Sequence, residues 1–476
     1  MNAITDFFDN STRKFPNKTA LVVDQRNYTY MDLDRQIQNF ASSLHYQRNS
    51  VISMMFENSL EFIVSYLGIL KAGCVAHIIM PNIAEHNLAA QLQSANPQAV
   101  ISSKDLLPKI EKIDNLKAEK FEFSELKPNG SGVNPQLQVE DIAYLIYTSG
   151  TTAAPKGIGV SHSNVVFTTN NIASVLGYSA SDVDVLPLSL SHSFGLGCMH
   201  TSFFSGSTLV LHKNANDVDE MLNSIGSHNA TTFAAVPTTL TKMLTHKDLH
   251  DYVSKLRLII TNSTSIAPST VRAYSKMLRK GKIATYYGLT EASRSSFMIF
   301  GNPEKDESVG LPAPGVKIKL VNDKNMESKE GMIWIKGKNV VNHYWNNLEA
   351  DKNICDGWIK TGDIGYVDSE GYLFLKGRSD DIINIGGEKV APGEVERIVM
   401  VLPGVREAVA IGVKHESFGQ VVKLFIQKSP GASIQKSDVL SHCIKNLERY
   451  KVPAQIEFID ELPRTEYGKI KRYELK

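Results

Sequence analysis

Cysteine is scarce in this sequence of 476 residues. The four cysteines, Cys74, Cys198, Cys355 and Cys443, stand far apart, and no two of them form a closely spaced pair. Zinc sites and disulfide frameworks both need cysteines at short, recurring spacings. The sequence therefore argues against both kinds of site, and a reducing compartment fits this cysteine usage best.

An excess of charge of either sign is also lacking. Lysine and arginine number 51 against 50 acidic residues, which excludes a strong global electric field that would attract nucleic acid or an anionic membrane.

The most apolar stretch, Phe62 to Leu70, is far shorter than the roughly 20 residues of a membrane span. Met1 to Asn10 has no basic region ahead of an apolar run, as a secretory signal would. We therefore expect a soluble, cytoplasmic protein whose partner is a small molecule.

Short, β-branched apolar runs alternate with helical patterns through the first half of the chain. These runs are Thr19 to Val23, Val51 to Phe56, Ala99 to Ser102, Ile142 to Tyr147 and Thr208 to Leu211. Between them, Ser59 to Lys71 places apolar residues at helical spacing. The alternation predicts parallel sheets covered by helices. From about Val309 the pattern changes to short strands and Gly-rich or Asn-rich turns, which predicts a small β-barrel or sheet.

The strongest local signal is the segment Tyr147 to Gly157, which reads YTSGTTAAPKG and follows an apolar strand. Its small residues allow backbone N–H groups to approach phosphate oxygens, its hydroxyls add donors, and Lys156 supplies a positive charge. A Walker A loop would have Ser or Thr after the lysine, where this sequence has Gly157. A Ser/Thr/Gly run alone is more often a flexible surface loop. Other segments of the chain must therefore decide whether this one binds phosphate.

Four further motifs follow in order along the chain. They are Tyr287 to Glu291 (YGLTE), Lys360 to Asp363 (KTGD), Gly377 to Asp381 (GRSDD) and Pro463 to Lys469 (PRTEYGK). Together with the loop, they resemble the signature motifs of the adenylate-forming superfamily of acyl-CoA and aryl-CoA synthetases, nonribosomal peptide synthetase adenylation domains and firefly-type luciferases. Weaker matches at Tyr28 to Leu33 and Lys71 to Gly73 extend the resemblance over nearly the whole chain.

The resemblance implies an α/β fold with two domains. We expect a large N-terminal domain of two doubly wound α/β subdomains plus a small β-barrel at residues 1–379, which binds ATP and the acid. A small, mobile α+β C-terminal domain at residues 380–476 would carry the adenylation lysine. Asp380 matches the hinge about which the small domain rotates after adenylation, and Gly386 and Gly387 in the following hairpin would allow a loop to move.

The implied reaction is the ATP-dependent activation of a carboxylic acid to an acyl-adenylate, with release of pyrophosphate. Because two anions must meet, charge neutralisation and positioning should dominate catalysis. By resemblance, Glu291 binds Mg²⁺ and Thr290 contacts the α-phosphate region, while Lys469 reaches the bond that forms. His192 matches a gating aromatic position between the ATP and acid sites. A carboxylate nucleophile needs no proton removed, so His192 is not expected to act as a general base.

The residues expected to bind ATP come from the loop and the three motifs that follow it. They are Thr148, Ser149, Gly150, Thr151, Thr152, Lys156, Tyr287, Asp363 and Arg378. Asp363 is the expected ligand of the ribose hydroxyls. Two segments depart from the family pattern: Ala153 replaces a usual glycine, and Thr261 to Ser265 replaces a Gly- and Ala-rich stretch beside the adenine and the acid.

The acid pocket is expected to be lined by residues of three segments. They are Ser193, Phe194, Gly197, Thr261, Tyr286, Arg294 and Ser295. Ser193 stands where amino-acid-activating relatives place an aspartate, and a hydroxyl cannot pair with a buried ammonium, so an α-amino acid is not expected. Arg294 could read a polar or anionic substituent, although pairing with a nearby acidic side chain is the more ordinary role.

The hairpin Gly386 to Lys389 looks like that of aryl-acid activators, which favours a substituted benzoate or anthranilate as the substrate. A fatty or short acyl acid is the alternative. The acceptor thiol would belong to CoA or to the phosphopantetheine arm of a carrier protein that acts in trans. Two other classes remain open, a luciferase-like oxygenase and a non-catalytic nucleotide-binding relative. A small-acid pocket argues against the first, and the presence of Glu291, Asp363 and Lys469 argues against the second.

Overall fold

The computed structural model describes residues 3–128, 137–148, 156–322, 324–386, 388–464 and 470–475. The chain divides into two compact units, which are described separately. The first consists of Met1–Ile318 and Ile335–Ile359, and the second of Lys319–Trp334 and Lys360–Lys476. The architecture is mixed α/β, as predicted. The expected domain boundary after residue 379 stays a prediction.

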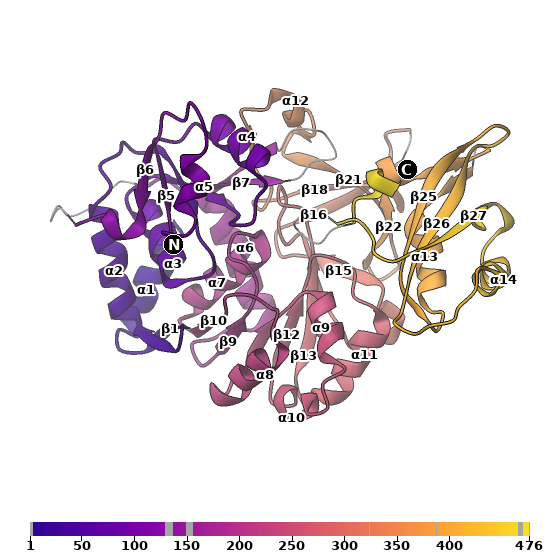
Figure 1. The fold of residues 1–476 in the computed structure, drawn as a ribbon, viewed down its shortest axis with the longest axis horizontal. Coiled ribbons are helices and arrows are strands. Elements are labelled where there is room, and N and C mark those ends of the chain that lie inside the picture. Colours follow the sequence, from indigo (N-terminus) through magenta and orange to yellow (C-terminus); the bar gives the residue numbers. More distant parts are fainter. Residues whose placement is uncertain are drawn as a thin grey trace. The chain divides into compact units, whose positions relative to one another are not determined.

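The first unit contains two sheets with helices packed on them (Figure 1). Its helices are α1 (Thr5–Lys14), α2 (Tyr30–Ser42), α3 (Leu60–Lys71), α4 (Glu85–Ala95), α5 (Leu107–Glu111), α6 (His162–Leu176), α7 (Ser193–Ser205), α8 (Val218–Ser227), α9 (Pro237–Met243), α10 (Leu249–Val253), α11 (Pro268–Met277) and α12 (Leu348–Asp351). In Figure 1, α1, α2 and α3 lie together on one side of this unit.

The first sheet joins strands from widely separated parts of the unit. Its order is β19 (Tyr344–Trp345), β8 (Lys156–Ser161), β7 (Ile142–Thr148), β4 (Val75–Ile79), β3 (Val51–Met55), β5 (Ala99–Ser102) and β6 (Glu119–Glu122). The strands from β7 to β6 are parallel, whereas β8 and β19 run antiparallel to their neighbours. The parallel strands β3, β4 and β5 are buried along their whole length, which explains their continuous apolar runs.

The second sheet carries the site. Within the first unit its order is β15 (Ser308–Pro312), β14 (Ser296–Ile299), β13 (Lys282–Tyr287), β12 (Leu258–Thr261), β11 (Thr232–Ala234), β9 (Val183–Leu186), β10 (Thr208–Leu211), β1 (Thr19–Val23) and β2 (Arg26–Thr29). The strands from β13 to β1 are parallel, and β14, β15 and β2 are antiparallel to their neighbours. The carboxyl ends of parallel strands share one edge of a sheet, which is where ligands of such folds usually bind.

Helix α7 is held on this sheet by a buried polar contact and by aromatic packing. Its Ser202 hydroxyl donates to the Asp184 carboxylate of β9, with 2.6 Å between the oxygens. Ser207 donates to the same carboxylate oxygen at 2.7 Å, so two of the donors to this buried carboxylate come from α7 and the turn after it. On another face, Phe203 packs edge-on against Phe8 of α1. These contacts hold the carboxyl end of α7 on the sheet, and the first residues of the helix are predicted site residues.

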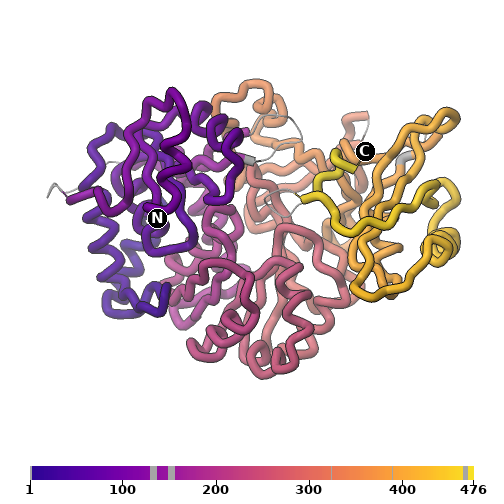
Figure 2. The backbone as a smooth tube through the Cα atoms, in the orientation of Figure 1, coloured from indigo at the N-terminus to yellow at the C-terminus, as the bar shows by residue number. Residues whose placement is uncertain are grey.

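The second unit has its own core. Its elements are β16 (Lys317–Val321), β17 (Glu327–Ser328), β18 (Glu330–Lys336), β21 (Trp358–Val367), β22 (Leu373–Arg378), β23 (Ile383–Ile385), β24 (Glu388–Val390), α13 (Pro392–Met400), β25 (Val405–His415), β26 (Gly419–Lys428), α14 (Lys436–Asn446) and β27 (Gln455–Ile459). Within the first unit, β20 (Ile354–Cys355) pairs with Trp358 and Ile359, the first two residues of β21. Val395 and Val399 of α13 and Val439 of α14 pack with β26 residues in one apolar cluster. Figure 2 shows the end of the chain returning to the β25–β26 hairpin, where Arg472 donates to the Ala410 carbonyl.

An ion pair joins the amino ends of the parallel strands in the second sheet. Arg257, just before β12, binds Asp182, just before β9, through two N–H···O contacts of 2.6 and 2.7 Å. Thr231 and the Ser179 backbone N–H also donate to Asp182. Burial alone would raise the pKa of Asp182, but the hydrogen bonds from Arg257, Thr231 and Ser179 outweigh it and lower the pKa. The ionised carboxylate is therefore part of the folded state.

Replacing Asp182→Asn should lower the free energy of unfolding at pH 7 by about 1–3 kcal/mol, because Arg257 loses its charged partner. Since the folded pKa lies below the unfolded value of about 3.9, the loss is full above that value and disappears as the pH falls through the folded pKa. Urea unfolding of wild type and variant between pH 7 and pH 2 measures the difference. The matched control is Glu349→Gln in the exposed pair with Lys352, which should change stability by less than about 1 kcal/mol. A pH-independent difference for Asp182→Asn would contradict the prediction.

Candidate functional site

The two ends of the predicted phosphate loop meet in a hairpin. Tyr147 of β7 lies opposite Gly157 of β8, and Thr148 lies opposite Lys156. The loop is therefore anchored on a buried strand pair of the first sheet. Its predicted ATP-binding residues Ser149, Gly150, Thr151 and Thr152, together with Ala153, lie outside the described residues, as does the side chain of Thr148. Their roles stay predictions.

The YGLTE motif forms a tight turn after β13. A Cβ atom on Gly288 would lie 2.5 Å from the carbonyl oxygen of Ala292, so this position has room only for glycine. Leu289 and Ala292 exchange backbone hydrogen bonds across the turn. Thr290 and Glu291 lie between them with half-buried side chains. The turn therefore places a hydroxyl and a carboxylate side by side at the carboxyl end of β13.

Glu291 is oriented by two contacts from a distant segment. The Tyr344 hydroxyl donates to its Oε1 atom at 3.1 Å, and the Val341 backbone N–H donates to its carbonyl oxygen at 2.9 Å. Carboxylate oxygens are preferred ligands of Mg²⁺, which proteins usually bind through one or two carboxylates while substrate phosphates and water complete the shell. Within the described ranges, no cluster of three or more His, Cys, Asp or Glu side chains could hold a metal ion. A single oriented carboxylate thus fits a Mg²⁺ ion that arrives with a nucleotide.

Arg294 follows the turn and has an unusual backbone conformation. Its φ angle is 54°, in the left-handed region that non-glycine residues rarely adopt. The side chain is only 5% exposed. Its guanidinium Nη2 atom donates to the Ser193 carbonyl at 2.6 Å and to the Tyr286 hydroxyl at 3.3 Å, while Nη1 donates to the Ser293 hydroxyl. Arg294 thereby ties the YGLTE turn to the first residue of α7.

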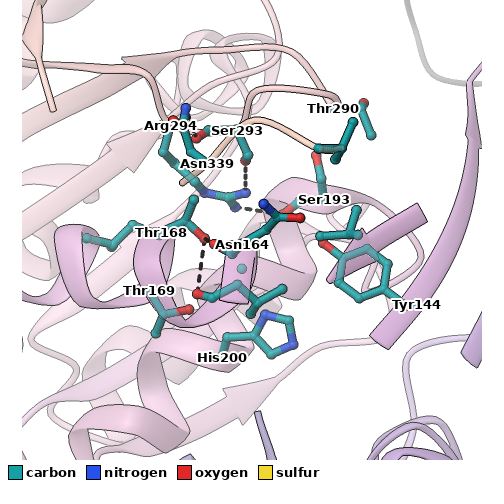
Figure 3. Close-up of a pocket in the computed structure, with 15 residues that line it drawn as sticks. Tyr144, Asn164, Thr168, Thr169, Ser193, His200, Thr290, Ser293, Arg294 and Asn339 are labelled. Carbon is teal, nitrogen blue, oxygen red and sulfur yellow. Dashed lines mark hydrogen bonds between the residues drawn. The ribbon is translucent and has the colours of Figure 1, made fainter. Parts of the chain in front are cut away.

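A small cavity lies beside this guanidinium (Figure 3). Polar groups predominate among its lining residues. They are Tyr144, Val160, Asn164, Val165, Thr168, Thr169, Ile172, Ser193, Gly197, His200, Thr290, Ser293, Arg294, Asn339 and Val341. The cavity volume of ≈ 20 Å³ is room for about one water molecule. In Figure 3, Arg294 and Asn339 lie on one side of the cavity and His200 lies on the other.

The predicted acid-pocket residues lie in and around this cavity. Ser193, Gly197 and Arg294 line it. Tyr286 stacks under the Arg294 guanidinium, 5.0 Å from carbon to ring centroid, and Phe194 packs edge-on against Tyr286. These residues are brought together, although Phe194 and Tyr286 are not among those that line the cavity.

Two other predicted pocket residues have supporting positions. The Ser295 hydroxyl donates to the Ala292 carbonyl and accepts a hydrogen bond of 2.9 Å from Asn339, which lines the cavity. Thr261 ends β12, and its fully buried hydroxyl has no hydrogen-bond partner among the described residues. Ser263 in the unusual stretch after it has a φ of 88°, a conformation typical of glycine. Asn262 ties this stretch to β13 through a hydrogen bond to the Tyr286 carbonyl.

His192 is the residue before α7. It is half-buried and takes an extended conformation, and its carbonyl accepts the first helical hydrogen bond, from Leu196. It is absent from the residues that line the described cavity. Its gating role stays a prediction.

The second unit brings two predicted nucleotide-binding residues together. Asp363 of β21 lies directly opposite Arg378 of β22, and the Arg378 Nη1 atom donates to the Asp363 carboxylate at 3.2 Å. The Asp363 backbone N–H donates to the Thr361 hydroxyl at 3.0 Å, which holds the KTGD turn. The hinge candidate Asp380 lies in a short 3-10 turn, Ser379–Asp381, directly after β22. Lys469 lies outside the described residues.

Sequence reasoning missed several residues of the cavity. Asn164 of α6 donates to the carbonyls of Lys338 and Val340, and so connects the helix to the segment that carries Asn339. His200 of α7 contacts the Tyr66 hydroxyl at 2.9 Å. An uncharged asparagine or histidine within a helical pattern gives no signal of its own. The amide-to-backbone contacts across about 175 residues of chain emerge only in the folded protein.

Comparison with known proteins gives a consistent result. The family model of the AMP-binding enzyme matches residues 8–345, and that of the AMP-binding enzyme C-terminal domain matches residues 394–469. An oxalate–CoA ligase from Arabidopsis thaliana is 30% identical over 99% of this chain and 97% of its own length. A long-chain-fatty-acid–CoA ligase from Haemophilus influenzae is 29% identical over 100% of this chain and 94% of its own length.

Solved structures are similar over the same span. The crystal structure of ATP-bound MatB from Rhodopseudomonas palustris has a TM-score of 0.92 and 26% identity, covering 100% of this chain and 98% of that one. The anthranilate CoA ligase AuaEII in complex with anthranoyl-AMP has a TM-score of 0.91 and 27% identity, covering 99% and 96%. The predicted resemblance and fold class are confirmed.

Within the described ranges, no helix combines the length and the apolar character needed to cross a membrane. The family match covers most of the chain, and the similarity to CoA ligases runs through both units. The chain belongs to the AMP-binding enzyme family and is an ATP-dependent, AMP-forming acid–thiol ligase.

Proposed function

We propose that this protein uses ATP and Mg²⁺ to activate a small, polar carboxylic acid as its acyl-adenylate and then transfers the acyl group to CoA. The observation that carries the proposal is the narrow polar cavity beside the YGLTE turn, lined by Arg294 and Asn339. Thr290 lines the same cavity, and the neighbouring Glu291 presents a carboxylate suited to Mg²⁺. An acid that places one polar group in the cavity would therefore lie next to the groups expected to hold the phosphates.

The acid itself is proposed from the character of the cavity. The cavity of ≈ 20 Å³ has room for one small polar group, and its lining of hydroxyl, amide and guanidinium groups favours an acid with a polar substituent. The aryl form of this proposal is a substituted benzoate or anthranilate, which the similarity to an anthranilate CoA ligase supports. The similarity to an oxalate–CoA ligase supports a small aliphatic acid.

A long-chain fatty acid is the second candidate, because a long-chain-fatty-acid–CoA ligase is similar over the whole chain. An alkyl chain would have to displace or leave unpaired the polar groups around the cavity, at a cost of about 1–3 kcal/mol for each buried group. This cost favours the compact acid. A phosphopantetheinylated carrier protein is the alternative acceptor to CoA.

Pyrophosphate exchange into ATP across a panel of acids tests the proposed reaction. We expect exchange with small polar aliphatic or aryl acids and little with palmitate or α-amino acids, because the cavity excludes a long chain and offers no carboxylate for an ammonium. Thioester formation from the best acid, measured with CoA and with a pantetheinylated carrier, identifies the acceptor. The absence of exchange with every acid, while ATP still binds, would favour a non-catalytic nucleotide-binding protein.

Glu291→Gln should reduce the rate of pyrophosphate exchange by about 10²–10³. The amide keeps the shape of the side chain and can still accept from Tyr344, but it lacks the charge that a Mg²⁺ ligand needs. The variant should also require a higher Mg²⁺ concentration for half-maximal exchange. Tyr344→Phe is the control, since it removes the orienting hydrogen bond while leaving the carboxylate, and should cost less than about tenfold. Equal effects of the two substitutions would exclude a metal-ligand role for Glu291.

Lys469→Ala should separate the two half-reactions. If Lys469 neutralises the charge that develops during adenylation, the variant loses pyrophosphate exchange by about 10²-fold or more. It should retain thioester formation from supplied acyl-adenylate and CoA, because the C-terminal domain is expected to rotate after adenylation and to carry Lys469 away from the reacting atoms. Lys471→Ala, in the same basic cluster, is the matched control and should leave exchange near the wild-type rate. Loss of both half-reactions in Lys469→Ala would contradict the proposal that Lys469 acts in adenylation but not in thioester formation.

A further inference from the structure

The Arg294 guanidinium is buried without a counter-ion in the part of the chain that the structure describes. It contacts the neutral oxygens of Ser193, Tyr286 and Ser293 and the ring of Tyr286. None of the ion pairs among the described residues includes Arg294, so the expected pairing with an acidic neighbour is not found there. By contrast, Arg257 of the same unit, although partly exposed, is paired with the carboxylate of Asp182.

Burial without an anion is costly, and two further features add to the cost. The Nε–H group of Arg294 is buried and has no hydrogen-bond partner in the described structure. Its backbone has the strained left-handed conformation, with φ at 54°. Buried charges are normally paired, and buried donors are normally bonded. Residues with several such costs at one site are typical of places where a ligand completes the environment.

The groups around the cavity cannot supply the missing negative charge. No Asp or Glu is among its lining residues. The titratable neighbour across the cavity is His200, and burial, with a smaller contribution from the Arg294 charge, lowers the pKa of His200 to about 3. His200 is therefore neutral near pH 7, and Arg294 is the one charged group among the cavity-lining residues. Ser193, Gly197 and His200 line the cavity from one side of α7, and none of them carries a negative charge.

Gly197 leaves the space that the guanidinium occupies. A Cβ atom at this position of α7 would lie 1.9 Å from Nη2 and 2.6 Å from the central carbon of the Arg294 guanidinium. Any side chain at position 197 would therefore displace the charge from the cavity. Because position 197 is glycine, the Arg294 guanidinium can lie against α7 at the wall of the cavity.

We propose that the acid substrate is a dicarboxylic acid, whose second carboxylate pairs with Arg294 while the first is adenylated. The inference rests on the proposed function, since it assumes that the cavity belongs to the acid site. The free Nε–H of Arg294 would bond a carboxylate oxygen, and the room beside it, about that of one water molecule, suits such an oxygen. The second carboxylate stays ionised and unreacted, so the reaction remains the loss of pyrophosphate on attack by the first carboxylate.

The test compares each dicarboxylic acid with its monoamide, which has nearly the same size but lacks the second charge. Malonate with malonamate and phthalate with phthalamate cover the aliphatic and aryl forms. With wild-type protein, we expect kcat/KM for pyrophosphate exchange to be roughly 30-fold or more higher for the better dicarboxylate than for its monoamide. A ratio near one, with exchange observed for both acids, would overturn the inference while leaving the proposed function intact. The absence of exchange with every acid, monocarboxylates included, would instead overturn the proposed function.

Variants identify the residue that reads the charge. Arg294→Met should bring the ratio of acid to monoamide close to one, and Arg294→Lys should restore part of it. Gly197→Ala should reduce the ratio in the same direction, because it displaces the guanidinium without removing it. If Arg294→Met lowers kcat/KM equally for the acid and the monoamide, Arg294 has a structural role or contacts ATP, and the inference is wrong. Because the wild-type ratio needs no variant, the proposal is decided even if Arg294→Met fails to fold.

Discussion

A buried guanidinium needs acceptors for its donors, and this need organises the site of the first unit. The Ser193 carbonyl and the Tyr286 hydroxyl must lie where Arg294 can reach them. The first belongs to the start of α7 and the second to β13, so one side chain makes the position of a helix depend on that of a strand. At the carboxyl end of α7, the hydrogen bond from Ser202 to Asp184 holds the helix on the sheet.

The position of Arg294 depends in turn on the geometry of the YGLTE turn. Gly288 lets the backbone of the turn close on Ala292, so that Thr290 and Glu291 lie at its tip. Arg294, three residues after Glu291, is buried. A side chain at position 288 would open the turn and move both groups together. Recognition of the phosphates, expected of Thr290 and Glu291, and recognition of the acid, proposed for Arg294, are therefore mechanically linked through one glycine.

The sequence predicted the strands of the parallel sheets closely, for a physical reason. The runs Thr19 to Val23, Ala99 to Ser102 and Thr208 to Leu211 coincide with β1, β5 and β10, and Ile142 to Tyr147 differs from β7 by one residue. Strands buried on both faces show as unbroken apolar runs, so a local pattern is sufficient to find them. The helix predicted from Ser59 to Lys71 likewise matches α3, with Ser59 as its N-cap residue. The motifs also identified the YGLTE turn, which follows β13, and the residues Asp363 and Arg378, which lie opposite each other on β21 and β22.

What the sequence could not predict is which groups share the cavity and which charges go unpaired. Asn164, His200 and Asn339 come from three distant segments, and their meeting depends on how α6, α7 and the turn around Asn339 pack. Whether Arg294 has an acidic partner is a property of the whole fold, since any carboxylate along the chain could have approached it. The ordinary expectation of an ion pair was reasonable for an arginine beside a pocket, yet the described neighbours are all neutral. An unpaired charge is thus the feature that tertiary structure adds to the motifs, and it is the basis of the proposed preference for a dicarboxylic acid.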